Sequence, residues 1–97
     1  MTVEVAELKL TCGAAPSQWE GRLVDGRPIY IRYRWGTLQI HFGPIGGTVE
    51  NALNAKPWFE DDVGEKLGAV ISLSDVADYS GLIVPQAILT DPHISNG

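Results

Sequence analysis

Apolar and polar side chains alternate almost without a break along residues 29–42, IYIRYRWGTLQIHF. A period of two is typical of a β-strand with one buried face. The alternation changes phase at Trp35-Gly36. Because paired residues must share a face, this change predicts a hairpin with a two-residue turn. The expected pairs are Ile29–Phe42, Ile31–Ile40 and Tyr33–Leu38.

A first hairpin is predicted just before this one, since the apolar residues of 19–33 also occupy odd positions. Pairing residues of one face across it requires a three-residue turn, Asp25-Gly26-Arg27. The expected pairs are Leu23–Ile29, Gly21–Ile31 and Trp19–Tyr33. In this register Glu20 would lie opposite Arg32 on the outward face and Arg22 beside Tyr30.

The rest of the chain shows weaker signals. Residues 2–11 alternate with a phase shift near Ala6, which indicates a strand with an irregularity. Helical spacing before Pro57 indicates a short helix over 48–55. The remaining expectations are a helix opened by Asp62 and ended at Gly68, a strand over 69–73, a helical turn from Ser74 to Gly81, one or two strands interrupted by Pro85, and a loose tail over 90–97.

Together these elements predict an α+β fold. We expect an antiparallel meander sheet of about four to six strands, with one or more short helices covering one face. The chain has 97 residues, and we expect residues 1–97 to form a single globular domain.

Charge changes this picture because it is unevenly spread. Residues 1–44 carry five basic and four acidic side chains, whereas residues 45–97 carry two basic and eight acidic ones, for a total of −5. An acidic second half repels phosphates and attracts basic surfaces. We therefore expect no direct binding of duplex nucleic acid.

Location and covalent chemistry are constrained by what the sequence contains. No apolar run approaches the roughly 20 residues that span a bilayer, and the first ten residues do not resemble a signal peptide. The single Cys12 has no partner for an internal disulfide. These features predict a cytoplasmic protein without a membrane segment.

Catalytic and cofactor motifs are not recognisable. His41 and His93 are the two histidines, and neither stands in a metal-ligand spacing. We expect no enzymatic activity, no metal and no cofactor. The alternative from another class is a small hydrolase or isomerase that uses Tyr30, Arg32 and His41 on the outward sheet face.

One segment resembles a known family. PSQWE, DGR and YIRY, within residues 16–33, are similar to the first hairpin of WW domains, where a tryptophan-glutamate start precedes a Gly-Arg turn and an aromatic strand. The next strand, TLQIHF, lacks the second tryptophan and closing proline of that family. A groove for proline-rich peptides is therefore not carried over.

Two surfaces are candidates for docking. In KPWFEDD, residues 56–62, two aromatics adjoin three carboxylates. The aromatics either cap the sheet or form a hot spot ringed by negative charge. The outward sheet face, with its arginines and tyrosine, is either solvated or a second docking face. The candidate partner-binding residues are Trp58, Phe59, Glu60, Asp61, Asp62, Glu65, Tyr30, Arg32 and Arg34.

These observations favour a non-enzymatic, inhibitor-like protein that docks on a basic surface of a protein partner. A small acidic chain without catalytic motifs is similar in general profile to phage-encoded inhibitors of nucleic-acid-binding complexes, such as anti-CRISPR proteins, and to toxin-neutralising immunity proteins. The alternative is an accessory or structural subunit of a larger assembly. Self-association into a homodimer stays open.

Overall fold

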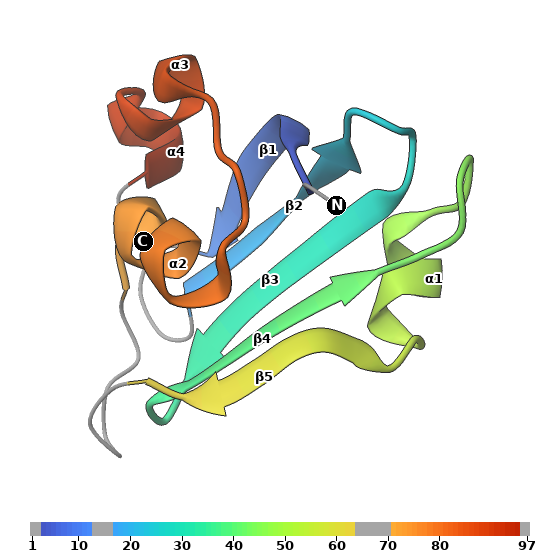
Figure 1. Cartoon of the computed structure of the whole chain (residues 1–97), viewed down its shortest axis with the longest axis horizontal. Coiled ribbons are helices and arrows are strands. Elements are labelled where there is room, and N and C mark those ends of the chain that lie inside the picture. The colour runs from blue at the N-terminus through green and yellow to red at the C-terminus, as the bar shows by residue number, and fades with distance from the viewer. Residues whose placement is uncertain (1–2, 13–16, 64–70, 96–97) are drawn as a thin grey trace.

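A computed structural model of the protein describes residues 3–12, 17–63 and 71–95. Five antiparallel strands form one sheet in chain order, which confirms the predicted meander and the α+β class (Figure 1). The strands are β1 (Val5–Cys12), β2 (Ser17–Leu23), β3 (Pro28–Arg34), β4 (Thr37–Phe42) and β5 (Pro57–Asp62).

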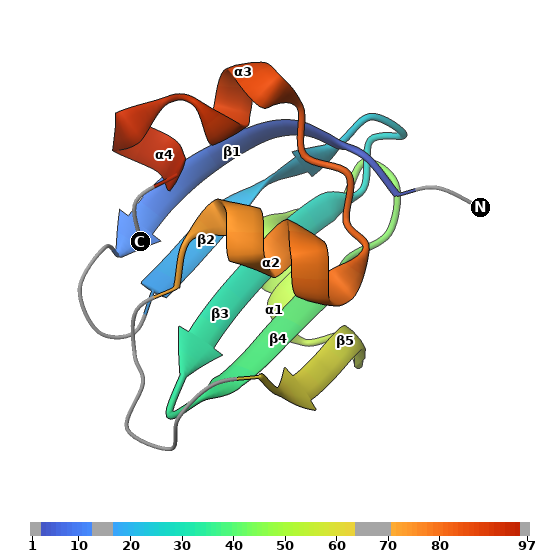
Figure 2. The same cartoon turned by 60° about the vertical axis from the view of Figure 1, so that its left-hand side comes forward.

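Four short helices flank the sheet, namely α1 (Val49–Leu53), α2 (Leu73–Ser80), α3 (Gln86–Leu89) and α4 (Pro92–Ser95). Figure 2 shows α2 lying across the apolar face of the sheet, with α3 and α4 beside β1 and α1 behind the sheet. The fully buried side chains between the sheet and α2 include Trp19, Ile31, Leu38, Ile40, Leu73 and Val76. Burial of these apolar groups is the main stabilising contribution to the fold.

The hairpin of β3 and β4 has the predicted register, with Ile31 opposite Ile40 and Tyr33 opposite Leu38. Its two-residue turn places Trp35 at φ 55° and Gly36 at φ 79°. Positive φ at both turn positions identifies a type I′ turn, whose twist matches that of the two strands. The parity argument therefore holds for this hairpin.

The hairpin of β2 and β3 differs from the prediction by two residues. Trp19 lies opposite Ile31 rather than Tyr33, and Gly21 lies opposite Ile29. The turn has three residues as expected, but they are 24–26, because the Leu23 N–H donates to the Arg27 carbonyl. A shift of two keeps every side chain on its face, so parity could not detect it. Gly26, at φ 93°, supplies the left-handed residue that ends such a turn.

Strand β1 contains the predicted irregularity. Its register against β2 shifts between Val5 and Glu7, around Ala6. At this bulge the backbones approach so closely that a Cβ on Gly21 would lie 2.0 Å from the Glu7 carbonyl oxygen. Glycine at position 21 is thus required for β1 to pair here.

Several weaker expectations are wrong. Asp62 ends strand β5 rather than capping a helix, and residues 64–70 lie outside the described ranges. Leu73 is helical, since α2 begins after the cap Ser72, although it ends at Gly81 as predicted. The segment after Pro85 is the helix α3 rather than a strand. The helix predicted over 48–55 is confirmed as α1.

The described part of the C-terminal segment, residues 90–95, is not loose. It forms α4, and the Trp19 side chain donates from Nε1 to the Ile94 carbonyl oxygen at 2.6 Å. This bond joins strand β2 to α4. Among the helices described, none is long and apolar enough to cross a membrane.

Candidate partner-binding surface

The two docking surfaces suggested by the sequence meet on one face of the sheet. Strand pairing aligns Arg32 of β3 with Gln39 of β4 and Glu60 of β5, and it aligns Arg34 with Thr37 and Asp62. The side chains of these two rows therefore lie on the sheet face opposite α2, at the end away from α1. We call this surface the polar sheet face, comprising Gln18, Arg32, Arg34, Thr37, Gln39, Glu60 and Asp62.

The carboxylates of β5 are divided between two faces. Glu60 accepts a hydrogen bond from the Gln39 amide, and Asp62 accepts one from the Thr37 hydroxyl at 2.6 Å. Asp61 lies on the other face, opposite Leu38, and its carboxylate accepts from the Asp62 N–H at 2.9 Å. All three residues are exposed, and none forms an ion pair with a described residue. Negative charge therefore surrounds the strand rather than forming one patch.

The two aromatics of this strand have different roles. Phe59 lies opposite Ile40 and is half-buried against the core. Trp58 sits at the register shift of β5, where its ring stacks on Phe42 with centroids 4.8 Å apart. Trp58 remains 42% exposed. Phe59 therefore belongs to the core, and Trp58 is the aromatic that a partner could contact.

The arginines differ in their surroundings. Arg32 is half-buried, and its Nε is buried without a hydrogen-bond acceptor among the described residues. Arg34 is exposed, and its guanidinium lies 5.4 Å from the centroid of the Trp35 ring. The predicted pairing of Arg32 with Glu20 is wrong, because Glu20 lies opposite Tyr30. Both arginines are thus unneutralised by carboxylates of the described chain.

Tyr30 and His41, the residues of the enzymatic alternative, lie at the end of the sheet near α1. Tyr30 is only 8% exposed, and the His41 Nδ1 lies 3.0 Å from the carbonyl oxygen of Ala55, just beyond α1. A carbonyl can only accept, so Nδ1 carries the proton. The two rings are tilted with centroids 6.1 Å apart. The helix α1 packs on β3 and β4 at this end, so both residues have a packing role.

Trp35 is an exposed residue that sequence reasoning missed. It is 55% exposed at the tip of the β3–β4 hairpin and adopts the left-handed conformation. A bulky residue rarely adopts a positive φ, so this backbone is strained. The signal was present in the sequence, because a two-residue turn at Trp35-Gly36 already implies positive φ at both positions.

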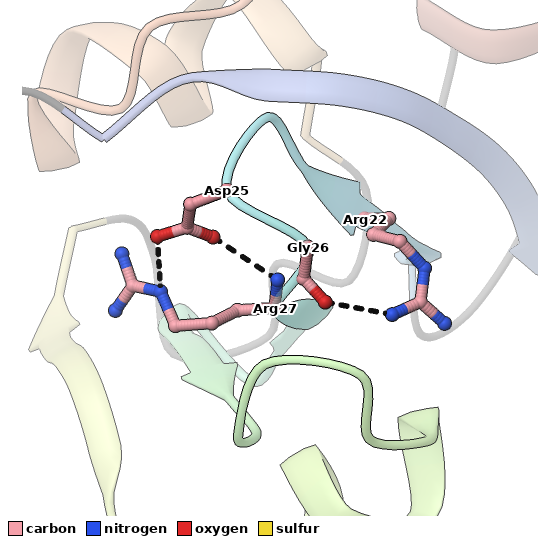
Figure 3. Close-up of polar contacts among 4 residues, drawn as sticks. All are labelled: Arg22, Asp25, Gly26 and Arg27. Carbon is pink, nitrogen blue, oxygen red and sulfur yellow. Dashed lines mark hydrogen bonds and ion pairs between the residues drawn. The ribbon is translucent and has the colours of Figure 1, made fainter.

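The turn that leads into β3 contains an ion pair between Asp25 and Arg27 (Figure 3). Asp25 accepts from the Arg27 backbone N–H at 3.0 Å and from Arg27 Nε at 2.7 Å. The backbone hydrogen bond from Arg27 holds the pKa of Asp25 below its usual value. Arg22 donates to the carbonyls of Gly26 and Gly47. These contacts shape the turn.

A shallow pocket of about 380 Å³ lies on the same side of the sheet as α1, toward β1. Its lining residues are Glu7, Leu8, Lys9, Glu20, Gly21, Arg22 and Val49. Opposite charges alternate around it, and Arg22 already has two carbonyl partners. The pocket contains none of the candidate partner-binding residues named from the sequence.

No three His, Cys, Asp or Glu side chains in residues 3–12, 17–63 and 71–95 come together as a metal site. Glu65 lies outside these ranges. Comparison with protein families, curated proteins and solved structures finds no match for the chain.

Proposed function

We propose that the chain is a non-enzymatic binding protein that docks its acidic edge on a basic surface of a protein partner. The observation that carries the proposal is strand β5, where Glu60, Asp61 and Asp62 are all exposed at the margin of the sheet. Trp58 beside them is 42% exposed. An exposed aromatic next to unpaired charges combines a contact anchor with long-range attraction.

The polar sheet face extends this surface. Arg32 and Arg34 lie two strands away from Glu60 and Asp62 on the same side of the sheet. A partner that approaches β5 with basic residues would present acidic or polar ones to the arginines. Such a two-sign pattern favours one orientation of docking and disfavours partners of uniform charge.

An inhibitory role is consistent with this chemistry. Surfaces that bind nucleic-acid phosphates are basic, so a protein that occupies such a surface blocks the nucleic acid from it. We therefore propose a phage-type inhibitor of a nucleic-acid-binding complex, such as an anti-CRISPR protein, as the specific form of the function. An accessory subunit that docks by the same edge is the alternative.

The proposal is tested by capturing the partner from the native host, purifying it and measuring association rates. Asp61→Lys with Asp62→Lys should reduce the association rate at least about tenfold at low salt. The matched control is Glu4→Lys with Asp78→Lys, two exposed carboxylates outside β5 whose reversal changes the net charge equally. Equal effects of the two double variants would contradict docking by β5 and leave only a general effect of net charge.

A further inference from the structure

Strand β5 is the last strand of the sheet, and no described element pairs with its outer side. The opposite margin, at β1, is partly covered. Glu4, just before β1, forms a parallel bridge with Ile83, and β1 itself contacts α4. An unpaired strand edge presents backbone donors and acceptors that can pair with another chain.

The hydrogen bonds identify which backbone groups face outward. The Val63 N–H donates to the Gly36 carbonyl oxygen at 2.9 Å. Because backbone groups of successive residues alternate in direction, Asp61 and Phe59 face β4. The N–H and C=O of Glu60 and Asp62 therefore face the open side. In agreement, the Asp62 N–H donates to the Asp61 carboxylate rather than to β4.

Charge determines what can occupy this edge. Three consecutive carboxylates would repel a second copy of β5, and like charges on neighbouring strands are destabilising. A segment with lysine or arginine at alternate positions would instead pair with Glu60 and Asp62, whose side chains lie on one face. Its intervening apolar side chains would lie on the face of Phe59, which is half-buried against the core.

We propose that the outer edge of β5 accepts an extended basic segment of a protein partner as a sixth strand. This inference rests on the proposed acidic docking and adds the mode of recognition. The incoming backbone bonds to the outward groups of Glu60 and Asp62. At the Asp62 N–H, a backbone carbonyl of the incoming strand takes the place of the Asp61 carboxylate.

The test uses the full chain labelled for NMR and a capped hexapeptide of alternating lysine and valine as the probe. Only alternate N–H groups of an added strand face the sheet. Two N-methylated peptides of equal charge, one methylated at the lysine nitrogens and one at the valine nitrogens, therefore separate strand pairing from charge attraction. One of them should bind at least about tenfold more weakly than the other. Hydrogen exchange at Glu60 should slow when the unmodified peptide binds.

The outcomes distinguish this inference from the function on which it rests. Equal binding of the two methylated peptides would overturn strand addition and leave acidic docking standing. Peptide binding that survives Glu60→Lys with Asp62→Lys would overturn the basic occupant and acidic docking together. Amide signals of β2, which does not contact Glu60 or Asp62, should stay unchanged in the double variant and show that its sheet is intact. Loss of binding in that variant, with unequal binding of the methylated peptides, supports both.

Discussion

Strands β3 and β5 have similar lengths and lie on either side of β4, yet their surroundings are opposite. In β3 all residues except Arg32 and Arg34 are buried, whereas in β5 only Phe59 is even half-buried. A central strand is held by packing on its apolar face and by ladders on both sides. An edge strand has a hydrogen-bond ladder on one side only, and most of its side chains are exposed to solvent. The difference separates residues that make the fold from residues available to a partner.

The largest effect is expected at the centre of β3. Ile31 is fully buried opposite Ile40, so Ile31→Ala should lower the free energy of unfolding by about 2–5 kcal/mol. Denaturant unfolding measures this change. Arg34→Ala on the same strand serves as control, with an expected change within about 0.5 kcal/mol. A tolerated Ile31→Ala with a damaging Arg34→Ala would invert the assignment of faces.

A smaller effect is expected from the aromatic of β5 that reaches the core. Phe59→Ala should cost about 1–2 kcal/mol, because the side chain is only half-buried. The comparison variant is Trp58→Ala, which should lose less stability, since Trp58 is more exposed and stacks only on Phe42. If Trp58→Ala proved the more damaging of the two, β5 would be anchored by the stack rather than by the core.

Arg32 tests whether a half-buried residue of β3 contributes to stability or is available to a partner. Within the described residues its Nε is buried without an acceptor and no carboxylate forms an ion pair with it, so Arg32→Met should change stability by under about 1 kcal/mol. Methionine keeps the apolar stem of the side chain and removes the guanidinium with its unsatisfied Nε. Thermal unfolding checks the prediction. A large loss would show that Arg32 is a structural residue and would remove it from the polar sheet face as a docking candidate.

The smallest effect is expected at the turn that leads into β3. The pKa of Asp25 is lowered in the folded protein, chiefly by the Arg27 backbone N–H. Its stabilising contribution is therefore present above the ordinary value of 3.8 and is lost as the pH falls through the lower folded value. Asp25→Asn should reduce this acid dependence slightly. Melting temperatures between about pH 6 and about pH 3 test it, and identical profiles would contradict it.

The parts predicted correctly are those where burial enforces a period. The alternation of β3 and β4 fixed their faces and, with the Trp35-Gly36 turn, their register. The register of β2 failed because parity cannot distinguish shifts of two, and the left-handed Gly26 belongs at the end of its turn rather than in the middle. Glycine placement was the missing constraint.

Strand β5 was missed for the same physical reason that makes it a candidate site. Exposed on both faces, it carries no alternating pattern, and Pro57 with three acids has low strand propensity. Its pairing with β4 comes from tertiary context. The docking residues named from sequence were therefore identified by composition, while their division between two faces required the fold.

The bond from Trp19 to Ile94 spans 75 positions of the chain. The Trp19 indole on β2 therefore lacks this acceptor until Ile94 has been synthesised and has left the ribosome. Contacts of such sequence separation form late and slow the approach to the native state. During translation the meander can assemble before residue 94 is available, so a nascent chain that stops short of Ile94 would leave the Trp19 indole without this acceptor.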